Sequence, residues 1–200
     1  MNTAGLNLLI PDKPDLERDA LASSFAKCGG AVHRIGRFWD PPVFDASTVR
    51  VCGADSFCLV LQQKLGLTLC SPEDELLLRV PSKFLSRRVI RCTLGEVLLF
   101  PAFVKPIVPK QFRGAVYRTI EELAAECAGL LPAVILSEPV ALAAEARTFV
   151  MEGRVLDCAV YEGEGKASEA EAFVSALTHE MALRRTVVID VGLIAGRGWD

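Results

Sequence analysis

Pro101-Ala-Phe-Val-Lys-Pro106 and the following Lys110-Gln-Phe-Arg-Gly-Ala-Val-Tyr117 place positive charges beside a short apolar strand. Lys105 ends that strand, and Pro106 restrains the backbone after it while the ammonium group stays able to reach a ligand oxygen. A lysine held in this way is typical of a phosphate-binding site. The alternative, that Lys105 and Lys110 are ordinary surface lysines near an edge strand, stays open at this point.

The same part of the chain concentrates positive charge. The formal net charge is -3, yet residues 83–118 contain eight basic residues and one acid. A local positive field on an acidic protein suits a small polyanion. An extended nucleic acid would favour a broader basic face, so nucleic-acid binding through residues 83–118 is the weaker hypothesis.

Composition indicates a globular protein of the cytoplasm. The 200 residues are 51% hydrophobic, which is enough for a substantial core, and the apolar runs are too short to span a membrane. The N-terminus lacks the basic start and apolar segment of a secretory signal. The seven cysteines are scattered without CxxC spacing, so we expect reduced thiols, and two histidines are too few for a histidine-rich zinc site.

Hydrophobic periodicity predicts a mixed α/β (α+β) fold. Residues 1–82 are expected to form an open N-terminal α/β lobe, with strands at 5–10, 31–35 and 47–52, helices at 14–28 and 55–65, and a helix beginning at Ser71-Pro72. Residues 83–200 are expected to form two small α+β subdomains, 83–140 and 141–200. Their expected elements are strands at 102–105, 115–118, 134–137 and 186–191, a hairpin of 141–151 with 154–161, and helices at 120–128 and 168–183.

Three further segments carry polar residues inside apolar surroundings: Ser137-Glu-Pro-Val140, Glu145-Ala-Arg-Thr-Phe-Val150 and Val187-Val-Ile-Asp-Val-Gly192. Strand periodicity puts Glu145, Arg147 and Phe149 on one face. Two opposite charges are costly to bury there without a partner, so they pair with each other or face a ligand. Asp190 ends an apolar run and likewise needs a cation or hydrogen bonds.

The order and spacing of these four segments resemble the ATP-grasp family. This resemblance implies a nucleotide cleft between the two subdomains, in which Lys105 contacts the phosphates of ATP and Lys110 and Arg113 support it. Arg88 falls where many members carry an earlier phosphate-binding lysine, although Arg91 or a solvated helix face is an alternative for that position.

The resemblance also implies roles for the later segments. Glu138 and Val140 would read the adenine through their backbone, with the Glu138 carboxylate facing the ligand or Lys105. A plain loop after an edge strand is the competing interpretation. Arg147, with Glu145 beside it, would lie next to the transferred phosphoryl group as the catalytic residue, and Asp190 would hold Mg²⁺.

One feature departs from the family pattern, because the usual second metal-binding motif, ExN, does not follow Asp190 in the sequence. We therefore expect a half-built metal site and an unpaired edge on the strand at 186–191. The implied function is an ATP-dependent carboxylate-amine ligase, which acts through an acyl phosphate on an unidentified carboxylate. The alternative is a truncated or degenerate module that binds nucleotide or a partner without catalysis.

Overall fold

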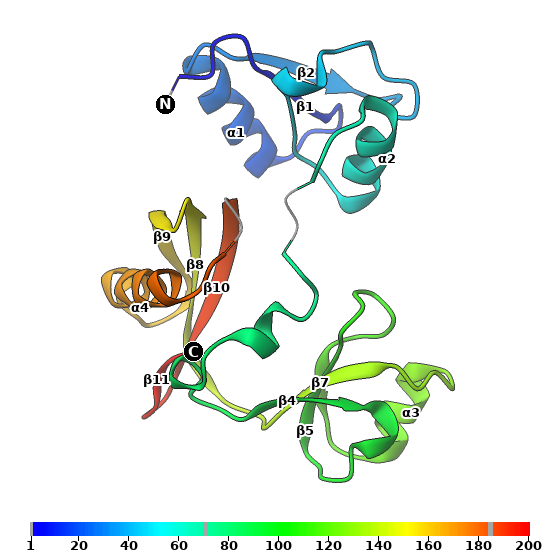
Figure 1. The fold of residues 1–200 in the computed structure, drawn as a ribbon, viewed down its shortest axis with the longest axis vertical. Helices are drawn as coiled ribbons and strands as arrows, with labels where there is room; N and C mark the ends of the chain where they lie inside the picture. Colours follow the sequence, from blue (N-terminus) through cyan, green and yellow to red (C-terminus); the bar gives the residue numbers. More distant parts are fainter. Residues whose placement is uncertain (1, 70–71, 184–185) are drawn as a thin grey trace. The chain divides into compact units, whose positions relative to one another are not determined.

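The computed structural model describes residues 2–69, 72–183 and 186–200, and Figure 1 shows its elements. The chain divides into two compact units, residues 1–69 and residues 70–200. Both units mix helices with strands, which confirms the expected α/β class. No helix within the described ranges is long and apolar enough to cross a lipid bilayer.

The N-terminal unit contains a three-stranded parallel sheet with the strand order β2-β1-β3. The side chain of Asp15 caps the start of α1, and Gly66 ends α2 in a left-handed conformation with φ of 66°. The elements of this unit are β1 (Asn7–Pro11), α1 (Leu16–Lys27), β2 (Ala31–Ile35), the 3-10 turn η1 (Ala46–Thr48), β3 (Val49–Val51) and α2 (Asp55–Leu65).

The central strand β1 is buried on both of its faces. Leu8 and Ile10 pack with Ala22 of α1, whereas Leu9 packs with Leu61 of α2. Successive side chains of a strand point to opposite faces, so the two helices cover opposite faces of the sheet. This is the open α/β lobe that the sequence predicts.

The C-terminal unit begins with an antiparallel sheet of order β4-β7-β5-β6. Leu123 and Cys127 of α3 pack on Val104 and Val134, so the helix covers one face of this sheet. The elements of this part are η2 (Leu76–Arg79), η3 (Ser82–Phe84), β4 (Val89–Thr93), η4 (Leu94–Glu96), β5 (Ala102–Pro106), β6 (Ala115–Tyr117), α3 (Ile120–Cys127) and β7 (Ala133–Ser137).

A second antiparallel sheet follows, with the order β11-β10-β8-β9. Figure 1 shows α4 lying across one face of it, where Ala170 and Val174 pack against Ala146 and Val150. The opposite face carries charged and aromatic side chains. The elements are β8 (Leu142–Met151), β9 (Arg154–Gly163), α4 (Ala167–Glu180), β10 (Thr186–Ile194) and β11 (Gly198–Trp199).

The expected helix beginning at Ser71-Pro72 is wrong. Residues 72–75 are not helical, the first helical turn is η2, and Ser71 lies outside the described residues. Three consecutive leucines do not form the one-sided stripe of an α-helix. Leu76 packs instead with Phe84 and Met181, so tertiary contacts determine the shape of this segment.

Two short strands were not expected from the sequence. β4 begins at Val89, so Arg88 lies directly before a strand and not on a solvated helix face. β11 pairs with Leu193 and Ile194 at the end of β10. It therefore covers only the last part of the edge that the sequence predicts to be unpaired.

Candidate functional site

Lys105 lies on the exposed face of β5. Val104 is buried on the α3 side, so the next side chain, Lys105, points to the opposite face, where it is exposed. A Cβ atom at Gly114 would come within 3.3 Å of the Lys105 Cγ atom. The backbone at Gly114 therefore packs on the aliphatic stem of Lys105, while the charged end lies at the surface.

The loop between β5 and β6 brings Lys110 into the same region of the chain. Lys110 has a φ of 66°, a left-handed conformation that residues other than glycine seldom adopt. The Tyr117 hydroxyl donates a hydrogen bond to the Arg113 carbonyl oxygen at 2.5 Å. This bond ties the end of the loop to β6 and helps to define its shape.

A cavity of about 500 Å³ lies where β4 and β5 begin and β7 ends. Its volume is in the range of small-molecule sites, and most of its lining is apolar. The residues that line it are Arg88, Ile90, Glu96, Leu98, Leu99, Pro101, Ala102, Leu136, Ser137 and Glu138.

The cavity brings together two of the expected ligand-binding residues, Arg88 and Glu138. Ala102 and Leu136 also pack in the core beneath α3, so the cavity lies on the α3 side of the sheet. Lys105 lies on the other face. The expected phosphate-binding lysine is therefore not part of this cavity, and neither Lys110 nor Val140 is among its described lining residues.

The Glu138 carboxylate is held by Arg197. The Arg197 guanidinium donates to both carboxylate oxygens, at 3.0 and 3.3 Å, and the Arg88 backbone N–H donates to one of them at 3.4 Å. These bonds, that from Arg197 first, lower the pKa of Glu138 below its ordinary value. Of the two orientations expected for this carboxylate, toward a ligand or toward Lys105, the structure shows neither.

The same region is fastened by Asp200, whose carboxylate is almost completely buried. Its Oδ1 atom accepts a hydrogen bond from the Ser86 backbone N–H at 2.7 Å, and its Oδ2 atom lies 2.8 Å from the Arg87 Nε atom. Arg197 also donates to the Ser86 carbonyl oxygen at 3.0 Å. The segment before β4, the end of β7 and the β10–β11 turn are thus tied together.

These pairings reduce the positive field of residues 83–118. Lys83 pairs with Glu180, Arg91 pairs with Glu75 at 3.1 Å, and Arg87 pairs with Asp200. Cations already paired with carboxylates attract an extended polyanion less strongly. The structure therefore gives no support to the nucleic-acid hypothesis.

The open face of the second sheet carries an arginine–aspartate pair. Ala146, Thr148 and Val150 of β8 are buried toward α4, which confirms that Arg147 lies on the opposite, exposed face. Arg147 and Asp190 are direct cross-strand partners. The Arg147 Nε atom donates to Asp190 Oδ1 and the NH2 group donates to Oδ2, both at 2.8 Å. The ion-pair partner of Arg147 is therefore Asp190 and not Glu145.

Glu145 has a different partner on the same face. Its Oε2 atom accepts a hydrogen bond from the Tyr161 hydroxyl at 2.7 Å. This bond is the main cause that raises the pKa of Tyr161 to about 12. The Tyr161 ring also lies beneath Arg147, with 5.5 Å between the Arg147 Cζ atom and the ring centroid. Four residues from three strands thus form one charged cluster.

Tyr161 was missed because its position depends on two irregularities of the hairpin. A register counted from the turn at Glu152-Gly153 would place Tyr161 opposite Ala144, on the buried face. β9 instead contains two extra residues, and the register passes from Ala146–Val160 to Glu145–Glu162 without a partner for Tyr161. Such bulges redirect side chains, and hydrophobic alternation alone does not reveal them.

The described residues do not by themselves form a metal site. They contain no group of three or more histidine, cysteine, aspartate or glutamate side chains placed to hold a metal ion. Both oxygens of Asp190 already accept hydrogen bonds from Arg147. Asp190 is thus a single carboxylate for Mg²⁺, which normally completes its shell with phosphate oxygens and waters.

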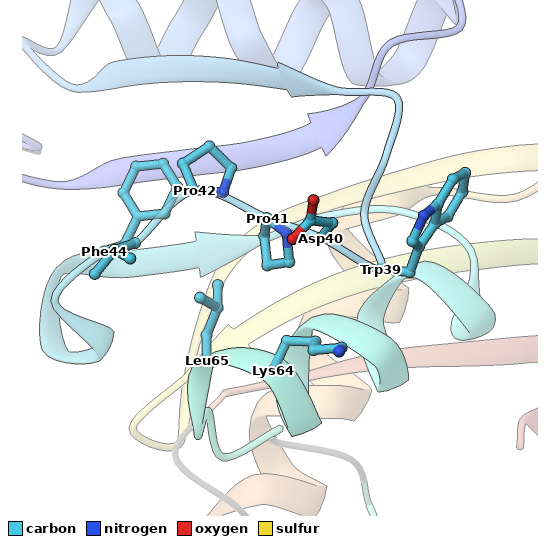
Figure 2. A pocket seen from close by; sticks show the side chains of 8 residues that line it. Trp39, Asp40, Pro41, Pro42, Phe44, Lys64 and Leu65 are labelled. Atoms are coloured by element: carbon cyan, nitrogen blue, oxygen red, sulfur yellow. The ribbon is translucent and has the colours of Figure 1, made fainter.

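A cavity of about 300 Å³ lies in the N-terminal unit, and Figure 2 shows it from close by. The loop after β2 forms one side of it, and Lys64 and Leu65 at the end of α2 form the other. It contains none of the residues expected to bind a nucleotide. The residues contributed by the loop are Trp39, Asp40, Pro41, Pro42, Val43 and Phe44.

The fold is shared with solved ATP-grasp structures. A RimK domain protein ATP-grasp from Sphaerobacter thermophilus matches with a TM-score of 0.64 and 16% identity, over 96% of this chain and 88% of that chain. The ADP complex of purK, an N5-carboxyaminoimidazole ribonucleotide synthetase, matches with a TM-score of 0.59 and 14% identity, over 98% and 68%. At these identities the likeness concerns the fold.

A third match is the ATP-grasp ligase PsnB, solved with a phosphomimetic variant of its minimal precursor, Mg and ADP. Its TM-score is 0.50 at 12% identity, over 100% of this chain and 86% of that chain. A comparison with curated proteins found no match. The model of a family described as an "ATP-grasp domain" matches residues 84–200, which is more than half of the sequence. The chain therefore belongs to the ATP-grasp family.

Proposed function

We propose that this protein binds ATP and transfers the γ-phosphoryl group to a substrate carboxylate. The carboxylate oxygen attacks the γ-phosphorus atom, the bond to the bridging oxygen breaks, and ADP leaves. An amine or another nucleophile then attacks the acyl phosphate and releases phosphate. Membership of the ATP-grasp family and its fold likeness to ligases support this reaction class.

The observation that carries the proposal is the exposed guanidinium of Arg147 on β8. Donors aimed at the developing negative charge supply much of the rate in phosphoryl transfer. Arg147 is placed by a regular cross-strand register and held by Asp190, so its position is already defined. We assign to it the stabilisation of the transferred phosphoryl group.

The other expected residues take supporting roles in this proposal. Lys105 and Lys110 bind the phosphates, and the backbone at Glu138 and Val140 reads the adenine. Mg²⁺ arrives bound to the nucleotide, with Asp190 as the nearest described carboxylate of the cluster that could accept it. The Mg and ADP present in the PsnB complex are consistent with this cofactor set.

A second candidate function is nucleotide binding without turnover. It is favoured by one observation, that both oxygens of Asp190 are engaged by Arg147 and no acidic cluster of described residues surrounds them. A metal held by one shared carboxylate is weakly placed for catalysis. This candidate predicts ATP binding with no release of ADP for any carboxylate and amine supplied.

Isothermal titration with Mg-ATP, followed by an assay of ADP release with panels of carboxylates and amines, tests both candidates. The Lys105→Met variant, which keeps the stem and removes the charge, should bind ATP about ten-fold more weakly than the wild type. The exposed Lys166, directly before α4, gives a matched control in Lys166→Met. Absence of binding heat with the wild type would contradict the proposal.

A further inference from the structure

Tyr161 occupies an extra position in β9. The register joins Ala146 to Val160 and Glu145 to Glu162, so Tyr161 is the residue that the bulge inserts. At such a bulge two residues of one strand oppose a single residue of the other. Tyr161 is thereby placed beside Glu145, on the open face that also carries Arg147.

Two independent contacts join Tyr161 to this face. Its hydroxyl donates a hydrogen bond to Glu145 Oε2 at 2.7 Å. Its ring lies under Arg147, at a Cζ-to-centroid distance of 5.5 Å, which is within the range of a cation–π interaction. One side chain therefore contacts both charged residues of β8.

Arg147 has two carboxylates within its neighbourhood. Asp190 lies directly across from it on β10, and Glu145 lies two residues away on the same face of β8. A second carboxylate paired with the guanidinium would cancel the charge that a phosphate needs. The Tyr161 hydroxyl satisfies Glu145 and so holds this carboxylate in a different contact.

We propose that Tyr161 is a positioning residue for Arg147, because it engages Glu145 through its hydroxyl and supports the guanidinium with its ring. The inference rests on the proposed function, in which Arg147 meets the phosphoryl group. It assigns to Glu145 the role of a charge that must be restrained, not that of a direct contact to the nucleotide.

A double-mutant cycle on Mg-ATP affinity tests this inference. Tyr161→Phe keeps the ring and removes the hydroxyl, and it should weaken Mg-ATP binding about five-fold, since Glu145 then turns toward Arg147. The same substitution in a Glu145→Gln background should change the affinity less than about two-fold, because no second negative charge is left to restrain. A purely structural role of Tyr161 would give the same loss in both backgrounds.

Tyr117→Phe is the matched control, since it removes the hydroxyl of the other tyrosine in the chain, whose acceptor is a backbone carbonyl. It should leave Mg-ATP affinity unchanged. Equal effects of Tyr161→Phe in the two backgrounds, or no effect in either, overturn the inference and leave the proposed function intact. Absence of Mg-ATP binding by the wild type overturns the proposed function and this inference with it.

Discussion

The guanidinium of Arg147 and the carboxylate of Asp190 form a two-bond pair across β8 and β10, with both donor–acceptor distances at 2.8 Å. Each group is the other's present partner. A phosphate that approaches Arg147 competes with Asp190, and a metal ion that approaches Asp190 competes with Arg147. Nucleotide and metal are therefore expected to bind together, since each replaces the partner that the other takes away.

The Asp190→Asn variant separates these two effects. Without its charged competitor, Arg147 should bind ATP about two- to five-fold more tightly in the absence of Mg²⁺, which corresponds to an exposed ion pair of up to about 1 kcal/mol. The further gain in affinity from Mg²⁺ should disappear. Titration calorimetry with EDTA and with Mg²⁺ measures both. An unchanged response to Mg²⁺ would show that Asp190 does not contact the metal; Asp157→Asn on β9 is the control.

The Arg147→Lys variant tests the planar guanidinium itself. Lysine keeps the charge but loses the two-bond geometry, so ATP-dependent turnover should fall by about 10²–10³. Thermal stability should change little, because the pair is half-exposed. ADP release and thermal unfolding are the two measurements. Full turnover in Arg147→Lys would remove Arg147 from the chemistry; Arg154→Lys, at the start of β9, controls for a generic loss of arginine.

Two glycines with the same backbone conformation should respond differently to alanine. Gly163 and Gly196 both have φ of 73°, but a Cβ atom at Gly163 would lie 2.1 Å from the Ala143 carbonyl oxygen, whereas at Gly196 it meets nothing within 4 Å. Gly163→Ala should lower the unfolding free energy by about 2–4 kcal/mol and Gly196→Ala by about 1 kcal/mol. Chemical denaturation measures both; equal losses would contradict the close backbone approach beside the Tyr161 bulge.

The pair of Glu138 and Arg197 predicts an acid-dependent stability. The pKa of Glu138 is lowered, first by the Arg197 side chain and then by the Arg88 backbone N–H. A lowered carboxyl pKa stabilises the folded protein above the unfolded-state value of about 4.5, and this stabilisation is lost as the pH falls through the folded-state value.

Arg197→Gln should therefore be less stable than the wild type at about pH 7, and the difference should shrink as the pH falls below about 4.5. Urea unfolding over a pH series measures it. A difference between the two proteins that stays constant down to about pH 3 would contradict the assigned cause. Arg154→Gln is again the matched control.

Local sequence patterns predicted much of the fold. The helix at 55–65 follows from its apolar spacing and from Gly66, and the β8–β9 hairpin follows from its alternation and the turn at Glu152-Gly153. The exposed face of Arg147 follows from the same alternation. These features depend on residues close together in the chain.

The site's pairings depend on residues far apart in the chain, and sequence patterns did not identify them. Arg197 and Glu138 are 59 positions apart, and Asp190 and Arg147 are 43 apart. Their contacts depend on sheet order and register, which local periodicity leaves open. Tyr161 needed a bulge in addition, and a bulge changes the face of a side chain without changing the sequence pattern.

A crystal structure of the protein with Mg²⁺ and a non-hydrolysable ATP analogue tests the central claim most directly. We expect the phosphate groups within hydrogen-bonding distance of the Lys105 ammonium and the Arg147 guanidinium, and the adenine against the backbone at Glu138 and Val140. A nucleotide bound with its phosphates out of reach of both Lys105 and Arg147 would contradict the account.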